Sequence, residues 1–392
     1  MHRPELLGAL LCAAGIAPAL AAAATPPPNT GVSIWTGNVT AFRRKHGAIP
    51  AAAHDWNLSA LPSYQPHRHV TGTIRLMGTD FSGLVKTWED AFREVQPGVS
   101  FTNDLQSSDI AMAAMITGSA DLAPAGREPS LDEILGFTEK YGYSVTPVAV
   151  GTGAWKSDRG NSWAPAVFVN EANPLNHLTL RQLDGIFGAA RTGGYGQNSK
   201  VFDPRAARSG DGNLRRWDQL GLGGEWKNRA IQTYGYADTG MRHFFELEVF
   251  DGGDKWNPNY REYVESGTKM VAPGTQVGSH EMLVALSHDK YGIAWSGLGQ
   301  AAGVPGIKAL SLAKGDGHYF ALNAENCRSH DYPLCRTIFM YVNRAPHRAL
   351  EPAVQEFLLF VLSREGQLLL AQHSVLLPLT QPTLAAQRRK LR

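Results

Sequence analysis

Two short polar runs, each standing directly before a predicted helix, have the composition of an anion-binding site. They are residues 78–82 (GTDFS) and 107–109 (SSD), and both carry hydroxyl side chains beside an aspartate. The first backbone N–H groups of a helix have no partner within it and carry about half a positive charge. Several such helix ends in one cleft suit a small oxyanion, to which hydroxyl groups add hydrogen bonds. Simple capping of each helix by its own Thr, Asp or Ser is the alternative.

Two further segments add arginines to this candidate site. The run APAGREP contains Arg127, whose planar guanidinium can bind two oxygens of one oxyanion. A surface ion pair of Arg127 with Glu128 or Asp132 is the competing interpretation. The run YGYADTGMRHFF contains Arg242, close to a Thr-Gly step. Both arginines are therefore candidates for charge-assisted bonds to the same anion.

Motifs typical of enzymes are absent from the sequence. It contains no GxSxG nucleophile elbow, HExxH zinc helix, GxxxxGK[ST] phosphate loop or CxxC pair. His67 and His69 have no carboxylate or cysteine partner nearby in the sequence, so a metal site is not expected. We expect a protein without enzymatic activity and without a cofactor.

The beginning of the chain has the features of a secretory signal peptide over residues 1–24. An apolar run rich in Ala and Leu is followed by small residues that offer cleavage sites. The run is too short to favour a membrane span. Lipid attachment at Cys12 is disfavoured because Leu11 occupies the preceding position, where a small residue is required. We expect a periplasmic or secreted protein.

Removal of the signal peptide leaves two cysteines, Cys327 and Cys335. An even pair, close in sequence, in an exported chain favours a disulfide across a short loop. Two reduced thiols would be the expectation for a cytosolic protein.

Strands and helices alternate from residue 71 onward, which is typical of an α/β fold with helices on both faces of the sheet. One predicted strand leaves the first lobe and another, at 337–343, returns to it. Two crossing strands imply a hinge and an interlobe cleft, where α/β proteins bind small ligands. The expected divisions are a signal peptide (1–24), an arm or linker (25–70), lobe 1 (71–148 and 336–380), lobe 2 (149–335, with an insertion at 153–164) and a basic C-terminal tail (381–392).

Charge does not indicate a nucleic-acid partner. The net charge of the 392 residues is only +2, and the basic residues cluster only in the C-terminal tail, which we expect to be solvated.

Residues 166–187 (AVFVNEANPLNHLTLRQLDGIF) combine a buried strand, an Asn-Pro turn and an amphipathic helix. This run resembles the second domain of periplasmic phosphate-binding proteins, the receptors of phosphate ABC transporters. Further similar segments are GS at 278–279, GIAWSG at 292–297, YPLCRTIFMYVN at 332–343, LSREGQ at 362–367 and PL at 378–379. The resemblance implies an α/β, two-lobed periplasmic-binding-protein fold of type II, with mixed, mostly parallel sheets, helices on both faces and a two-strand hinge.

The same resemblance implies that the protein captures an inorganic oxyanion, phosphate above all, and delivers it as a monomer to an ABC permease. The implied ligand-binding residues are Thr79, Asp80, Phe81, Ser82, Ser107, Ser108, Arg127, Thr239, Gly240 and Arg242. Asp80 would accept a hydrogen bond from a protonated phosphate oxygen, which sulfate does not offer.

Two positions depart from the family pattern. Tyr236 stands where the family has Arg, and Met241 stands where a second hydroxyl is expected. Each missing bond would cost about 1–3 kcal/mol in a desolvated site. Arg242, Lys156 or Arg159 could compensate. A binding, sensing or secreted interaction protein with altered or lost phosphate binding is therefore the alternative on the same fold.

Overall fold

The computed structural model describes residues 56–81, 83–153, 164–196, 199–237, 240–264, 278–315, 317–374 and 376–392. Several expectations concern residues outside these ranges. These are the signal peptide with Cys12, residues 25–55 of the arm, most of the insertion at 153–164 with Lys156 and Arg159, and the candidate ligands Ser82 and Thr239.

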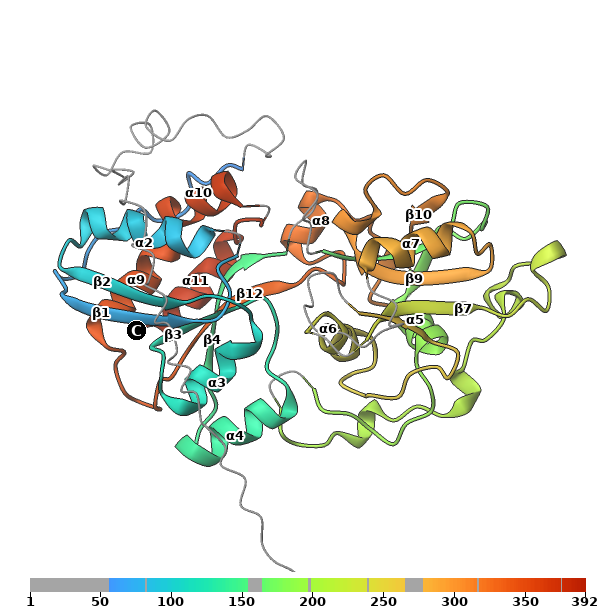
Figure 1. Ribbon diagram of the computed structural model, residues 1–392, viewed down its shortest axis with the longest axis horizontal. Coiled ribbons are helices and arrows are strands. Elements are labelled where there is room, and N and C mark those ends of the chain that lie inside the picture. The colour runs from blue at the N-terminus through green and yellow to red at the C-terminus, as the bar shows by residue number, and fades with distance from the viewer. Residues whose placement is uncertain are drawn as a thin grey trace, which may run out of the picture. The chain divides into compact units, whose positions relative to one another are not determined.

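The first lobe is built on a five-stranded sheet with the order β2-β1-β3-β12-β4. The strands are β1 Gly72–Met77, β2 Val99–Asp104, β3 Leu122–Ala125, β4 Thr146–Thr152 and β12 Thr337–Val342. β1 is parallel to β2 and β3, whereas β12 is antiparallel to β3 and β4. Four strands therefore run in one direction and β12, which returns from the second lobe, runs in the other (Figure 1).

The second lobe contains a sheet of the same kind, with the order β10-β5-β9-β7-β8. Its strands are β5 Pro165–Asn170, β7 Gln232–Tyr236, β8 Arg261–Tyr263, β9 Gly292–Gly297 and β10 Ile307–Ala309. β7 is parallel to β8 and β9, and β5 is antiparallel to β9 and β10. A parallel pair of short strands, β6 His177–Thr179 and β11 Ser311–Ala313, completes this lobe. The two mixed sheets confirm the predicted fold class.

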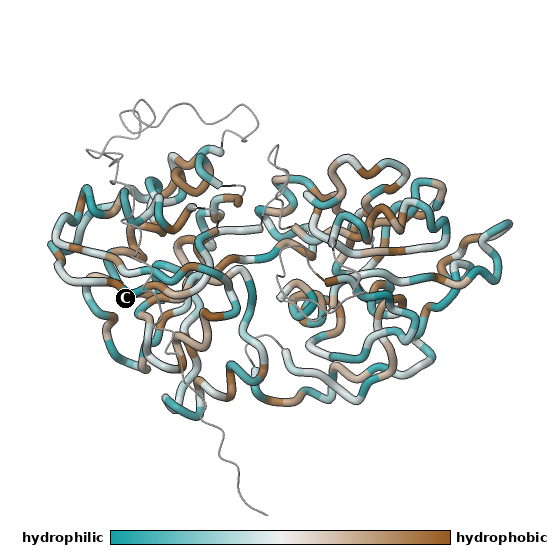
Figure 2. Tube along the Cα trace, in the orientation of Figure 1, coloured by the Kyte–Doolittle hydropathy of each residue, from teal (hydrophilic) through white to brown (hydrophobic). Residues whose placement is uncertain are grey.

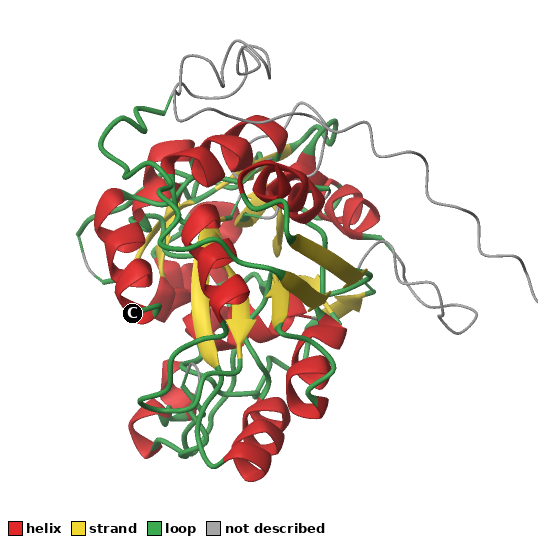
Figure 3. Ribbon diagram, turned by 90° about the vertical axis from the view of Figure 1, so that its left-hand side faces the viewer, coloured by secondary structure: helices red, strands yellow, loops and turns green. Residues whose placement is uncertain are grey.

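Helices flank the strands on both sides (Figure 3). In the first lobe they are α2 Leu84–Val95, α3 Asp109–Thr117, α4 Leu131–Tyr141, α9 Pro352–Val361, α10 Arg364–His373 and α11 Gln381–Lys390. In the second lobe they are α5 Leu180–Phe187, α6 Gly240–Val249, α7 Ser279–Ser287 and α8 Ala324–Ser329. Short 3-10 turns, η1 to η5, cover Pro204–Ala206, Gly210–Gly212, Trp217–Leu220, Gly224–Trp226 and Leu298–Ala301. None of the helices in the described ranges is long and apolar enough to cross a membrane.

Each lobe has its own hydrophobic core. In the first lobe Phe92 packs against Phe357 and Phe360, with ring centroids 5.3 and 5.6 Å away. In the second lobe Phe245 and Trp295 stack at 4.6 Å. Figure 2 shows hydrophobic stretches in the elements of both lobes. Each lobe therefore has apolar packing of its own, and Trp56 packs against both cores.

Two chain segments cross between the lobes. β4 stays paired with β12 as far as Thr152, beyond the expected boundary at residue 148. The Gly153 N–H then donates to the Arg336 carbonyl oxygen at 2.5 Å, so the outgoing and returning chains are bonded where they cross. Cys327 and Cys335 form the predicted disulfide, which closes the loop directly before Arg336.

The arm is bonded to the first lobe over its described part, residues 56–70. The Tyr64 N–H donates to the Glu365 carboxylate at 2.7 Å, and its hydroxyl donates to Glu356 at 2.8 Å. Leu61 is buried in the first-lobe core. This part of the arm is therefore held by both apolar packing and hydrogen bonds to two buried carboxylates.

The expectation of a solvated C-terminal tail over residues 381–392 is wrong. Residues Gln381–Lys390 form α11. Leu384 and Leu391 are each only 1% exposed, and the Gln387 side chain accepts a hydrogen bond from the Ala149 N–H at 3.1 Å. Apolar side chains at helical spacing thus bury one face of α11 against the lobe, and Arg388 and Lys390 add hydrogen bonds to the carbonyl oxygens of Leu359, Leu362 and Pro147.

Replacing Leu384 by Ala should lower the free energy of unfolding by about 2–4 kcal/mol, because a fully buried Leu leaves a cavity. The matched control is Leu135→Ala, since Leu135 on α4 is 42% exposed. The control should change stability by no more than about 0.5 kcal/mol. Urea unfolding of both variants checks this, and equal effects would contradict the docked helix.

Candidate functional site

Three turns of the first lobe meet at the carboxyl ends of β1, β2 and β3. The Gly78 N–H donates to Asp104 and its carbonyl accepts from Ser107, both at 2.9 Å, while Thr79 N–H donates to Pro124 at 2.9 Å. Gly78 has φ 155°, and a Cβ there would lie 2.1 Å from the Pro124 oxygen, so only glycine fits. The parallel strands therefore deliver the polar turns predicted from the sequence to one place.

Asp80 bonds to the first turn of helix α2 as well as standing in the candidate site. Its carboxylate accepts from the Lys86 N–H at 3.3 Å, and its carbonyl accepts from Val85 at 3.2 Å. Burial raises the pKa of Asp80 above its ordinary value, and the backbone N–H groups oppose that shift. The next residue, Phe81, has the left-handed φ of 49°, which turns the chain into the helix. Asp80 thus bonds to the first turn of α2, although the N-cap residue of that helix is Gly83 and not Thr79 or Asp80 as the alternative expected.

Ser107 and Ser108 have different partners. The Ser107 hydroxyl accepts from the Asp109 N–H at 3.1 Å and donates to the Asp109 carboxylate at 2.9 Å. The Ser108 hydroxyl oxygen accepts from the Gly126 N–H at 3.0 Å, which leaves its hydrogen as a donor. Ser108 does not cap α3 through its side chain. Of the two, Ser108 is placed better to bind an anion.

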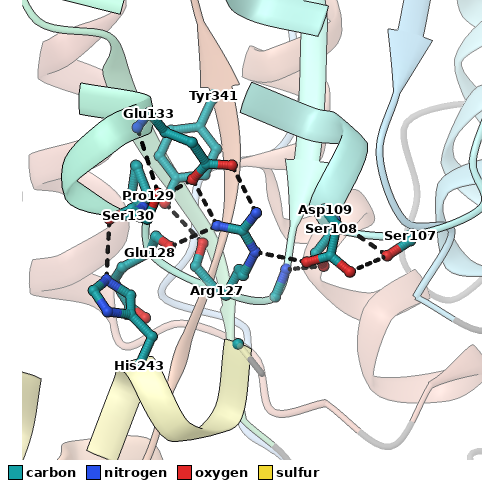
Figure 4. Close-up of polar contacts among 12 residues, drawn as sticks. Ser107, Ser108, Asp109, Arg127, Glu128, Pro129, Ser130, Glu133, His243 and Tyr341 are labelled. Atoms are coloured by element: carbon teal, nitrogen blue, oxygen red, sulfur yellow. Dashed lines mark hydrogen bonds and ion pairs between the residues drawn. The ribbon is translucent and has the colours of Figure 1, made fainter. Parts of the chain in front are cut away.

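Arg127 is held by carboxylates other than the two expected from the sequence. Its guanidinium forms a forked pair with Glu133, both contacts being 2.7 Å, and a third bond with Asp109 at 3.1 Å (Figure 4). Burial opposes the charge, yet the pairs with Glu133 and Asp109 raise the pKa of Arg127 above its ordinary value. Glu133 also forms the capping box of α4 with Ser130. Arg127 is therefore a fixed cation at the start of α4.

The second lobe reaches this site through the first turn of α6. A Cβ on Gly240 would lie 2.7 Å from the Arg127 Cδ, so the arginine stem packs directly on the glycine. The His243 ring nitrogen Nε2 lies 3.1 Å from the Pro129 carbonyl oxygen (Figure 4). Residues of the two lobes are thus in contact where the polar turns converge.

Arg242, also in the first turn of α6, is held by residues of its own lobe. It pairs with Glu246 at 3.3 Å and Glu262 at 2.6 Å and stacks on Trp256 at 4.8 Å. Glu246 and Glu262 therefore balance the positive charge of Arg242 within the second lobe. Arg127 packs on Gly240 and Ser108 bonds to the neighbouring Gly126 N–H, whereas the ion pairs of Arg242 lie within the second lobe.

The two departures from the family pattern are both buried. The Tyr236 hydroxyl lies 2.7 Å from the Ser296 hydroxyl, and its ring packs edge-on against Trp295 at 5.0 Å. The Met241 sulfur lies 3.2 Å from the Arg336 guanidinium. Tyr236 therefore contributes to the second-lobe core.

Sequence reasoning assigned no role to Glu133, His243 and Arg336, and it noted Asp109 only as the aspartate beside Ser107 and Ser108. Glu133 stands three residues after Ser130, the spacing of a capping box, and this signal could have located it. Arg336 was noted only as part of the similar segment 332–343, directly before the predicted strand 337–343. In the described part of the chain no cluster of His, Cys, Asp and Glu could hold a metal ion.

A hollow of about 500 Å³ lies beside the lobe contact. It is lined by Ser130 and Asp132 from the start of α4, by Thr192 and Phe202 from a second-lobe loop, and by His243. Its lining includes none of the candidate anion-binding residues that the structure describes. The chemistry of the converging turns, not the size of this hollow, identifies the candidate site.

Comparisons with known proteins identify the family of the chain. Residues 65–365 match the PBP superfamily domain. The chain is 32% identical over 311 residues to the phosphate-binding protein PstS of Pseudomonas aeruginosa, covering 79% of this chain and 84% of that protein. It is 22% identical over 356 residues to protein SphX of Synechococcus elongatus, covering 89% of each. A solved ABC-type phosphate transport receptor from Vibrio cholerae is similar at 18% identity and a TM-score of 0.47, covering 78% of this chain and 99% of that one.

Glu248 on α6 should make stability depend on pH. Burial, together with the charge of Glu128, raises the pKa of Glu248 from 4.5 to about 7. Because the folded protein holds this proton more tightly than the unfolded chain, the stability it provides is complete below pH 4.5 and is lost as pH rises through 7. Glu248→Gln should therefore stabilise the protein at pH 8, by on the order of 1 kcal/mol, and do so much less at pH 5.

Thermal unfolding at the two pH values measures this difference. Glu139→Gln, which alters an exposed carboxylate on α4, is the control. An equal effect of Glu248→Gln at both pH values would contradict the predicted titration.

Proposed function

Because the chain belongs to the phosphate-binding protein family of the PBP superfamily, we propose that it is an extracytoplasmic receptor that captures phosphate between its lobes. In this proposal it acts as a monomer without enzymatic activity and delivers phosphate to an ABC permease. The observation that carries the proposal is the convergence of Ser108, Arg127 and Gly240 at the contact between the lobes.

The proposed site binds the anion by hydrogen bonds and by charge. The Ser108 hydroxyl donates to one oxygen, and the N–H groups at the start of α6 add the positive end of that helix. The Arg127 guanidinium lies beside them, with Glu133 and Asp109 offsetting part of its charge. Because its carboxylate partners hold the guanidinium in place, little conformational entropy is lost when the anion binds.

Asp80 would make the proposed site select phosphate over sulfate. Its half-buried carboxylate can accept a hydrogen bond from a protonated phosphate oxygen, but repels an anion that has no proton. The proposal therefore requires Asp80 to be ionised when the ligand binds.

Tyr236 and Met241 should lower the affinity of the site for phosphate, because they replace an Arg and a hydroxyl residue of the family pattern. The two bonds that an Arg and a hydroxyl would form are each worth about 1–3 kcal/mol, so phosphate binding should be weaker than in a site that has both. A protein that fails to bind phosphate and gains affinity on Tyr236→Arg would support the alternative of a binding or interaction protein that has lost phosphate. Tight binding by the unaltered protein rules that alternative out.

Isothermal titration of the mature protein with phosphate and with sulfate tests the proposal. Phosphate should release heat with one site per chain, and sulfate at the same concentration should not. An absence of heat with phosphate, arsenate and sulfate at millimolar concentration would reject the receptor function.

Arg127→Gln should weaken phosphate binding by roughly 10- to 100-fold, because it removes a charge-assisted hydrogen bond. Arg205→Gln is the matched control, since the Arg205 side chain is 90% exposed and pairs with Asp203 far along the second-lobe loop. Similar phosphate affinities for the two variants would place the anion somewhere other than beside Arg127.

A further inference from the structure

The loop that carries Arg127 makes consecutive contacts with the other lobe. The Arg127 stem packs on Gly240, and two residues later the Pro129 carbonyl faces the His243 ring at 3.1 Å. Gly240 and His243 both belong to the first turn of α6. The loop 127–129 therefore lies along the first turn of α6. The N–H groups of that turn form one side of the proposed anion site.

Arg336 lies behind this contact and touches both sides of it. Its guanidinium donates to the Gly240 carbonyl at 3.4 Å and contacts the Met241 sulfur at 3.2 Å, both in α6. On the other side it pairs with Glu128 of the first lobe at 3.8 Å. The guanidinium also lies over the Phe244 ring at 5.0 Å. Arg336 and Glu128 are only 5% and 2% exposed, so water screens their interaction little.

The backbone of Arg336 belongs to the hinge. Its carbonyl accepts the Gly153 N–H, which joins the two crossing segments. The residue before it, Cys335, is fixed by the disulfide to Cys327. The position of the guanidinium is therefore set by the hinge, while its contacts lie in the two lobes that the hinge connects.

We propose that Arg336 is a positioning residue that couples the hinge to lobe closure, by holding the first turn of α6 against the loop 127–129 over the anion site. This inference rests on the proposed receptor function for its ligand. When the lobes separate, the contacts of Arg336 with Glu128 and with α6 cannot both be kept. Loss of the guanidinium therefore lowers the population of the closed form, and the apparent affinity falls with that population.

The test compares Arg336→Gln, Arg336→Lys, Glu128→Gln and the double variant Glu128→Gln/Arg336→Gln with the unaltered protein. Arg336→Gln should raise the Kd for phosphate roughly tenfold, mostly through faster dissociation measured by stopped flow. Arg336→Lys should recover part of the loss because it keeps the charge. The double variant should lose less than the product of the two single effects, since both act on one contact.

Arg191→Gln is the matched control. Arg191 is also buried, at 8% exposure, but its forked pair with Asp184 lies within the second lobe. It should lower the melting temperature and leave the Kd and the dissociation rate unchanged. If Arg336→Gln does not fold, Glu128→Gln carries the test alone. An unchanged Kd and dissociation rate in a folded Arg336→Gln or Glu128→Gln variant overturns the proposal.

Small-angle X-ray scattering separates this inference from the receptor function. Without ligand, Arg336→Gln should have a larger radius of gyration than Arg191→Gln, because its lobes close less often. If the unaltered protein binds no phosphate but this difference is found, the closing role stands and the proposed ligand fails. Equal radii together with equal affinities reject the closing role.

Discussion

The contact between the Arg127 stem and Gly240 is the constraint on which the arrangement of the site depends. A Cβ at position 240 would lie 2.7 Å from that stem, so the two lobes approach this closely only because a glycine begins α6. At the same point Glu133 and Asp109 fix the guanidinium in direction. A cation, two hydroxyl-bearing turns and a helix start are thereby held within one small region, which is the arrangement that an oxyanion requires.

The sheets bring these groups together from distant parts of the chain. Parallel pairing of β1 with β2 and β3 places three turns at one edge, and hydrogen bonds through Gly78 and Thr79 tie the turns to one another. The antiparallel strand β12 then links this edge to the second lobe, with Arg336 at its start. In the proposed receptor, anion binding and lobe closure would consequently involve neighbouring residues, so a ligand that bridges the turns and α6 would also favour the closed form.

Much of the fold could be predicted from the sequence because its signals are local. The capping box of Thr179 and Gln182 and the alternation of strands and helices mark elements directly. The tail at 381–392 was misjudged because its basic residues dominate its composition, whereas burial of Leu384 and Leu391 decides its position. The partners of Arg127 could not be assigned in advance, since the choice between Glu128, Asp132 and Glu133 depends on the direction of α4. The contacts of Arg336 were hidden for the same reason, because they join segments that are far apart in the chain.

The most direct test of the central claim is a crystal structure of the mature protein grown with phosphate. The account predicts tetrahedral density within hydrogen-bond distance of the Ser108 hydroxyl, the Arg127 guanidinium and the first N–H groups of α6. It also predicts that Arg336 keeps its contacts with Glu128 and Gly240 in that crystal. Phosphate bound elsewhere, or an empty cleft at saturating phosphate, would contradict it.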